Sequence, residues 1–144
     1  MFRKLTDTVY ASPQIGLDEV TEAANSGFAL IINNRPEGES PDQTPGDAIA
    51  EAAQAAGLAY VAIPITHAGF SEPQVNAMVE ALASAGDGKV LAYCRSGTRS
   101  TLLWSLAQAS TGADPDSLTA IAAGAGYDLG PIRPMLDILS ARSR

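Results

Sequence analysis

The segment 93–100, with the sequence YCRSGTRS, combines a thiol, two guanidinium groups and a short loop that contains glycine. Cys94 is the only cysteine in the 144 residues, and Arg95 and Arg99 both lie within five residues of it. An apolar run precedes the segment and a helical pattern follows it, so we expect the loop to lie between a strand and a helix N-terminus. The backbone N–H groups and the helix N-terminus of such a loop form a cradle for anions.

A thiol at the mouth of such a cradle is expected to ionise readily. Nearby cations and a helix N-terminus lower cysteine pKa values to about 3.5–7.5. The thiolate would then attack, or carry, a group that is delivered as an anion. The alternative, that Cys94 only fills the core, is a common fate of a free cysteine, but two guanidinium groups beside it argue against this, because burying unpaired charge is costly. The sequence therefore predicts Cys94 as a nucleophile and Arg99 as the clamp for the anion.

The composition limits the partners and the compartment. The net charge of −7 argues against nucleic acid and anionic membranes as partners. A single cysteine forbids an internal disulfide, and any sulfur or redox cycle would have to pass to another molecule. We find no secretory signal pattern, no apolar run near ~18 residues and no cluster with metal-ligand spacing. We therefore expect a single cytoplasmic domain over residues 1–144, without metal or cofactor, that acts on a small anionic substrate.

Four apolar runs, at 5–11, 28–32, 59–63 and 90–93, are typical of strands, and segments with helical periodicity separate them. The last three runs are nearly continuous in apolar residues, which favours strands buried on both faces. The segment 101–109 is apolar almost all round, so its helix should be central. The alternation predicts an α/β fold with a parallel sheet of about four strands and helices on both faces.

Ligands of such sheets bind outside the carboxyl ends of the strands. Three loops should meet there: 33–39, 64–70 and the cysteine loop. They bring the only histidine, one more arginine and two glutamates toward the thiol. The predicted anion-binding residues are Arg95, Ser96, Gly97, Thr98, Arg35 and His67.

Two of these residues have an equally simple structural interpretation. Arg35 could contact the anion, or it could fix its own turn by donating to carbonyl groups. His67 could orient the substrate or accept a proton, or it could be a structural or merely exposed histidine.

The loop 94–100 and the upstream segment 33–39 together resemble a bacterial family of small domains that occur fused to beta-lactamase-like hydrolases, as their phosphatase-like domain. The resemblance covers roughly residues 5–139. It implies a protein-tyrosine-phosphatase fold of the small dual-specificity type, and members are described both as phosphatase-like and as sulfurtransferases. It also raises a sulfur-metabolising hydrolase as a partner. Ser100 matches the phosphatase pattern, in which a hydroxyl after the arginine steadies the thiolate.

The sequence departs from the phosphatase signature at two positions. Tyr93 stands where the signature has histidine, and four residues rather than five separate Cys94 from Arg99. The shorter loop resembles that of rhodanese sulfurtransferases. A tighter cradle offers fewer amides to a tetrahedral phosphoryl group and suits a single terminal sulfur atom on Cys94.

The two chemistries differ in their need for an acid. A phosphatase must protonate the leaving alkoxide, and Glu37, Glu39 and Asp128 are candidates by position only. Sulfur transfer from thiosulfate needs no acid, because sulfite leaves as a stable anion. We therefore expect a sulfurtransferase with a Cys94 persulfide. The alternatives are a phosphatase-like hydrolase with a phosphocysteine intermediate, and a non-catalytic module that senses anions or redox state.

Overall fold

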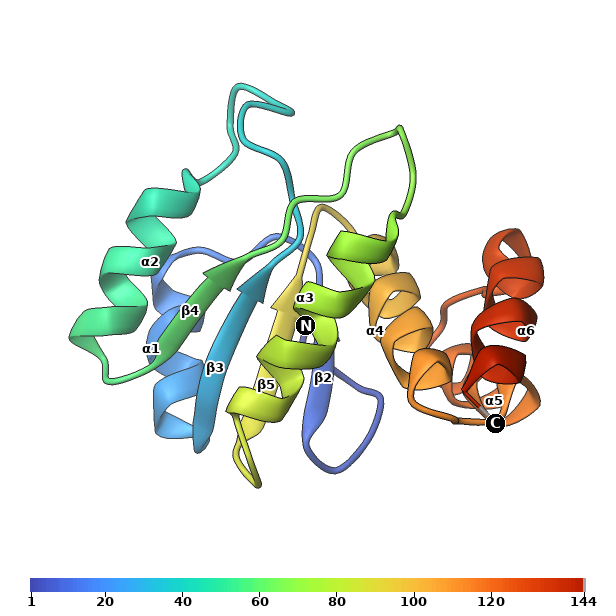
Figure 1. The fold of residues 1–144 in the computed structure, drawn as a ribbon. Helices are drawn as coiled ribbons and strands as arrows, with labels where there is room; N and C mark the ends of the chain where they lie inside the picture. The colour runs from blue at the N-terminus through green and yellow to red at the C-terminus, as the bar shows by residue number, and fades with distance from the viewer. Residues whose placement is uncertain (144) are drawn as a thin grey trace.

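The computed structural model describes residues 1–143, and in it a five-stranded sheet separates two layers of helices (Figure 1). The strands are β1 (Arg3–Lys4), β2 (Val9–Ser12), β3 (Phe28–Asn33), β4 (Ala59–Ala62) and β5 (Lys89–Tyr93). Their order across the sheet is β1-β2-β5-β3-β4, and all neighbours are parallel except β1 and β2. The predicted α/β class with a mainly parallel sheet is confirmed.

The first predicted strand, 5–11, is wrong in its extent, because the chain turns back within it. The hydroxyl of Thr6 accepts hydrogen bonds from the backbone N–H groups of Thr8 and Val9, at 3.2 and 3.0 Å. The N–H of Leu5 donates to the carbonyl of Val9 at 2.9 Å and closes the hairpin. Local bonds from threonine side chains compete in this way with an extended strand. The result is a fifth, antiparallel edge strand, β1, which the apolar pattern did not predict.

Residues 1–143 form six α-helices. They are α1 (Leu17–Asn25), α2 (Gly46–Ala55), α3 (Glu72–Ser84), α4 (Thr98–Ser110), α5 (Pro115–Gly124) and α6 (Arg133–Arg142), with a short 3₁₀ helix over Gly130–Ile132 before the last. Helices α1 and α2 pack on one face, and α3 and α4 pack on the other, where α5 and α6 extend the layer behind α4 (Figure 1). No helix among residues 1–143 has the length and apolar character needed to span a bilayer.

The strands β3 and β5 contribute side chains to the hydrophobic cores on both faces of the sheet. On β3 and β5, Ile31 and Leu91 face α1 and α2, while Ile32 and Ala92 face the layer of α3 and α4. Because successive side chains of a strand point to opposite faces, a strand covered on both sides must be apolar at nearly every position. This explains the continuous apolar runs in the sequence.

Helix α4 is the central helix, as predicted. Its residues 100–107 are all buried, between α3, α6 and the sheet. It begins directly beyond β5, and the register pairs Tyr93 of β5 with Ser12 of β2 and Asn33 of β3. Strand β4 ends at the same level, since Ala62 pairs with Asn33. The loops that follow these strands therefore start side by side at one edge of the sheet.

Candidate active site

The cysteine loop joins β5 to the N-terminus of α4. Cys94 is fully buried, and its Sγ accepts a hydrogen bond from the backbone N–H of Gly97 at 3.1 Å. Gly97 begins the helix with a φ of +91°, a conformation that favours glycine. A Cβ at this position would also overlap the hydroxyl of Tyr127. The sequence requires glycine here for both reasons, and the tight turn that results aims a backbone N–H at the sulfur.

Tyr127 supports this loop from outside, and the sequence analysis did not identify it. Its hydroxyl donates to the carbonyl of Ser96 at 3.2 Å, and its ring packs under the guanidinium of Arg3 at 5.1 Å. On the other side, the N–H of Gln14 donates to the carbonyl of Arg95 at 3.2 Å. The loop is thus fixed through its carbonyl groups, while the N–H groups of Gly97 and Thr98 donate within the loop, to Cys94 Sγ and to the hydroxyl of Ser96.

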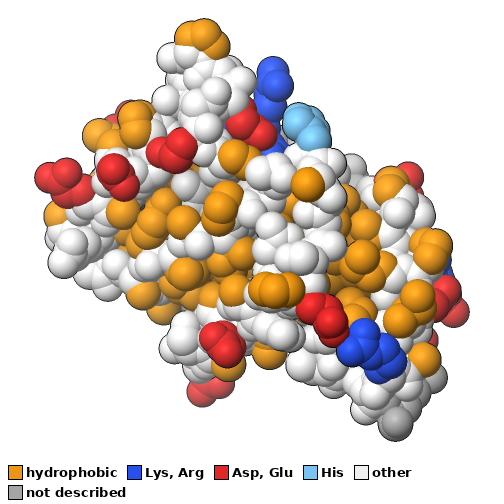
Figure 2. Space-filling view, turned by 45° about the horizontal axis from the view of Figure 1, so that its top comes forward, with side chains coloured by type: hydrophobic (Ala, Val, Ile, Leu, Met, Phe, Trp, Pro, Cys, Tyr) orange, Lys and Arg blue, Asp and Glu red, His pale blue; other side chains and the backbone are white. Residues whose placement is uncertain are grey.

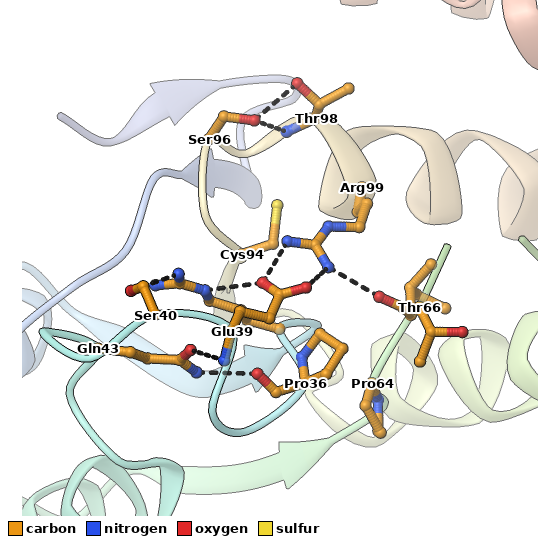
Figure 3. Close-up of polar contacts among 12 residues, drawn as sticks. Pro36, Glu39, Ser40, Gln43, Pro64, Thr66, Cys94, Ser96, Thr98 and Arg99 are labelled. Carbon is orange, nitrogen blue, oxygen red and sulfur yellow. Dashed lines mark hydrogen bonds and ion pairs between the residues drawn. The ribbon is translucent and has the colours of Figure 1, made fainter. Parts of the chain in front are cut away.

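The hydroxyl groups of the loop are placed differently from one another. Ser96 and Thr98 are hydrogen-bonded to each other at 2.9 Å, and Figure 3 draws this pair above Cys94 and Arg99 beside Cys94. The hydroxyl of Ser100 is buried and has no hydrogen-bond partner among residues 1–143. Buried polar groups are normally satisfied, so this hydroxyl is available to a group that forms or arrives during a reaction.

Arg99 is held by three hydrogen bonds (Figure 3). Its Nη1 and Nη2 donate to the two carboxylate oxygens of Glu39 at 2.7 and 2.8 Å, and Nη1 also donates to the carbonyl of Ile65 at 2.8 Å. The pKa of Arg99 is raised, mainly by the hydrogen bonds with Glu39, and the nearby Cys94 adds to the rise. Three of the five guanidinium N–H groups are used, which leaves Nε–H and one N–H of Nη2 along a single edge. That edge can take an anion in the bidentate manner.

The surroundings of Glu39 argue against the predicted role of its carboxyl group as a general acid. The hydrogen bonds from Arg99, and then those from Arg35, lower its pKa to about 2, although partial burial opposes the shift. Arg35 is 4% exposed and donates to Glu39, Gln14 and Ser40 at 2.9, 3.0 and 3.1 Å. Each of the three guanidinium nitrogens of Arg35 therefore donates a hydrogen bond to a neighbouring side chain. Arg35 supports the carboxylate of Glu39, and it is not among the residues that line the pocket described below.

The other two candidate acids, Glu37 and Asp128, each accept a hydrogen bond from a nearby backbone N–H group. The carboxylate of Glu37 accepts from the N–H of Gly46 at 2.6 Å, at the start of α2, and it lines a different hollow. Asp128 is exposed and accepts from the N–H of Gly130 at 2.8 Å. Each carboxylate has a local structural partner at the beginning of a helix. The structure therefore brings none of the three predicted acids to the pocket as a proton donor.

An open pocket of about 440 Å³ lies over the cysteine loop. It is lined by Pro36, Glu39, Thr66, His67, Arg95, Ser96 and Arg99. These residues come from the three predicted loops, so their convergence at the carboxyl edge of the sheet is confirmed. Arg95 and His67 are exposed at its wall. Residues 1–143 contain no group of three or more histidine, cysteine or acidic side chains placed to hold a metal ion.

Replacing Glu39 with glutamine is expected to lower the free energy of unfolding by about 1–2 kcal/mol at neutral pH, allowing for solvent screening. The folded pKa of about 2 lies below the ordinary value of 4.5, so the carboxylate stabilises the fold above pH 4.5 and this contribution is lost as the pH falls toward 2. The difference between the two proteins should therefore shrink over that interval. Urea unfolding at neutral pH and near pH ~3 measures it.

Glu72→Gln is the matched control for this experiment. Glu72 is also paired with an arginine, Arg142, at 2.8 Å, but both side chains are well exposed. Exposed pairs contribute about 0–1 kcal/mol, so this variant should unfold nearly as the wild type does. A Glu39→Gln deficit that stays constant from neutral to acidic pH would contradict the assignment of the low pKa to Glu39.

The strand, the cysteine loop and the arginine at the start of a buried helix define a protein of the protein-tyrosine-phosphatase-like fold. The chain belongs to the family described as beta-lactamase hydrolase-like protein, phosphatase-like domain, whose model matches residues 1–111. Over 127 residues the chain is 36% identical to the beta-lactamase hydrolase-like protein of Xylella fastidiosa. The matched region covers 88% of this chain and 29% of that relative. The chain thus spans less than a third of the length of this curated relative.

Solved structures show the same architecture. A protein from Neisseria meningitidis Z2491, described as a "putative phosphatase", is 32% identical, with a TM-score of 0.81 over 95% of this chain and 96% of its own. PTPMT1, solved in complex with PI(5)P, has a TM-score of 0.71 over 99% of both chains. It is 14% identical, so it supports the fold alone. The matched family and the similarity to the Neisseria protein support a phosphatase-like protein. They give the expected sulfurtransferase activity no support.

Proposed function

We propose that the chain is a cysteine-dependent phosphatase that hydrolyses phosphate monoesters through a phosphocysteine intermediate. One observation carries the proposal: the side chain of Arg99, at the N-terminus of α4, lies near Cys94 and lines the pocket over the cysteine loop. A phosphate dianion needs bidentate donors and backbone N–H groups, and this arrangement offers both. The phosphatase-like family and the similarity to the Neisseria protein point the same way.

In the proposed reaction, Cys94 attacks phosphorus while Arg99 holds two oxygens of the phosphoryl group. The negative charge that develops on those oxygens is stabilised by the guanidinium edge and by the N–H groups of the loop. The buried hydroxyl of Ser100, which has no partner among residues 1–143, would donate to the thiolate and steady it when it leaves again. Water then hydrolyses the phosphocysteine and releases inorganic phosphate.

Sulfur transfer is the second candidate, and the loop length favours it. Only four residues separate Cys94 from Arg99. In this tight turn, one of the loop N–H groups, that of Gly97, is directed at the sulfur itself. Such a cradle fits one terminal sulfur atom on Cys94, as a persulfide would place it. The experiment must therefore separate the two reactions on the same protein.

Steady-state release of inorganic phosphate from 4-nitrophenyl phosphate tests the proposal. We expect many turnovers per chain, and a mass gain of one phosphoryl group on Cys94 after an acid quench. In parallel, the protein is treated with thiosulfate, desalted, weighed and treated with cyanide. A gain of one sulfur atom that cyanide removes as thiocyanate, without phosphate release from the ester, would replace the phosphatase with a sulfurtransferase. Modification of Cys94 once, without turnover of either substrate, would indicate a sensor.

A further inference from the structure

No residue has yet been assigned as the proton donor for the leaving group of the proposed phosphatase reaction. The residues that line the pocket limit the candidates for this role. Of its seven lining residues, proline, threonine and serine do not titrate near neutral pH, and the two arginines keep their protons. Both carboxylate oxygens of Glu39 accept hydrogen bonds from Arg99, and one also accepts from Arg35, which favours the ionised form and lowers its pKa to about 2. The remaining residue is His67, and imidazole is the side chain that ordinarily exchanges a proton between about pH 5 and 8.

The loop after β4 holds His67 at the rim in a defined way. Thr66 and Gly69 close a turn, with the N–H of Gly69 donating to the carbonyl of Thr66 at 3.1 Å. His67 is at the exposed tip of this turn. One residue before the turn, the carbonyl of Ile65 accepts from Nη1 of Arg99 at 2.8 Å. The loop that carries the imidazole is thus tied to the guanidinium that would hold the phosphoryl group.

The imidazole itself is uncommitted. His67 is exposed and makes no hydrogen bond or ion pair with the rest of residues 1–143. Figure 2 shows the only histidine projecting from the surface beside side chains of lysine or arginine type. A structural histidine would have a partner within the fold. An imidazole with none, at the wall of a pocket for anions, can turn toward a ligand.

We propose that His67 is the general acid and base of the reaction, a role that rests on the proposed phosphatase function. Sγ of Cys94 attacks phosphorus and forms the S–P bond as the P–O ester bond breaks. The leaving oxygen keeps the electron pair of that bond and takes the ring proton of the imidazolium. In the second step, water attacks phosphorus and gives one proton to the now neutral imidazole, while the S–P bond breaks and the thiolate leaves. His67 returns to its protonated state, and phosphate is released.

The test compares two aryl phosphates that differ only in how badly the leaving group needs a proton. In His67→Gln, we expect kcat/KM for phenyl phosphate, which reports the steps up to the transfer of the phosphoryl group to Cys94, to fall about 10²-fold. We expect kcat/KM for 4-nitrophenyl phosphate, whose phenolate leaves readily without a proton, to fall less than about tenfold. The measured signature is the ratio of the two losses. Circular dichroism and thermal unfolding confirm that the variant is folded.

His67→Lys is the matched variant, because it keeps a positive charge at the rim but is a poor proton donor at neutral pH. If His67 acts as the acid, His67→Lys should show the same selective loss on phenyl phosphate. Two results would overturn the assignment and leave His67 as an anion contact. One is wild-type activity of His67→Lys toward both substrates, and the other is an equal loss of activity toward both substrates in His67→Gln. If the wild type releases phosphate from neither ester, it is the phosphatase function that fails.

Discussion

Replacing Cys94 with serine is expected to reduce kcat/KM for 4-nitrophenyl phosphate by a factor on the order of 10⁴ or more, while the protein stays folded. A hydroxyl is a far weaker nucleophile than a thiolate at neutral pH, and the reaction as proposed has no other route to the covalent intermediate. Serine fits the site, because Cys94 is fully buried and its Sγ already accepts a hydrogen bond from Gly97. The change in the free energy of unfolding should stay within about 2 kcal/mol.

The decisive readout for this variant pairs activity with binding. Cys94→Ser should still bind inorganic phosphate, since Arg99 and the loop N–H groups remain, and calorimetry measures this directly. It should form neither the phosphoryl adduct nor the persulfide, as intact mass would show. Retention of more than about one part in a hundred of the wild-type turnover would rule out Cys94 as the nucleophile in either chemistry.

Replacing Arg99 with lysine is expected to lower kcat/KM by about 10²–10³-fold. The native guanidinium donates to both oxygens of Glu39 and to the carbonyl of Ile65 with three N–H groups, and still presents an unused edge. A lysine ammonium has only three donors at one point and cannot serve the carboxylate, the carbonyl and a ligand together. The affinity for inorganic phosphate should fall as well, so both binding and kinetics report the loss.

Arg142→Lys is the control for the arginine chemistry. Arg142 also donates to a carboxylate, that of Glu72, at 2.8 Å, but it lies at the exposed end of α6. Its substitution should leave kcat/KM within about twofold of the wild type, because exposed pairs contribute little to stability and this pair is remote from the pocket. Wild-type kinetics in Arg99→Lys would remove Arg99 from the site.

The sheet and the meeting of the loops could be predicted from the sequence because they depend on short-range patterns. The apolar runs of β3 and β5 are buried on both faces, so composition alone marks them. The run of β4 is equally apolar, but β4 is an edge strand and its residues are exposed or half-buried, so the expected burial on both faces is wrong for it. The carboxyl ends of parallel strands share one edge of the sheet. The positions of Cys94, His67 and Glu39 in the chain, each after a strand, were therefore enough to predict that these residues lie close together. Strand β1 was not predicted, because its two residues are exposed and polar and show no alternation of apolar and polar side chains.

Side-chain directions could not be predicted in the same way. Glu37 and Glu39 are two residues apart in one loop, and nothing in the sequence shows that Glu37 turns toward the start of α2 while Glu39 turns toward Arg99. The support that Tyr127 gives to the loop at Ser96 spans 31 positions in the chain, and a tyrosine after a helix is typical of ordinary core packing. The distinction between phosphate and sulfur chemistry is harder still, because both use the same thiol and guanidinium.

The anchoring of Arg99 has a consequence for how anions bind. A mobile arginine gives up as much as about 2 kcal/mol of side-chain conformational entropy when a ligand fixes it. Here hydrogen bonds to Glu39 and to the carbonyl of Ile65 within the fold already restrict the guanidinium. Fixing the side chain is therefore part of folding rather than of recognition. An incoming anion meets a preorganised edge, and its association should carry a smaller entropic cost than binding to the exposed Arg95 at the pocket wall.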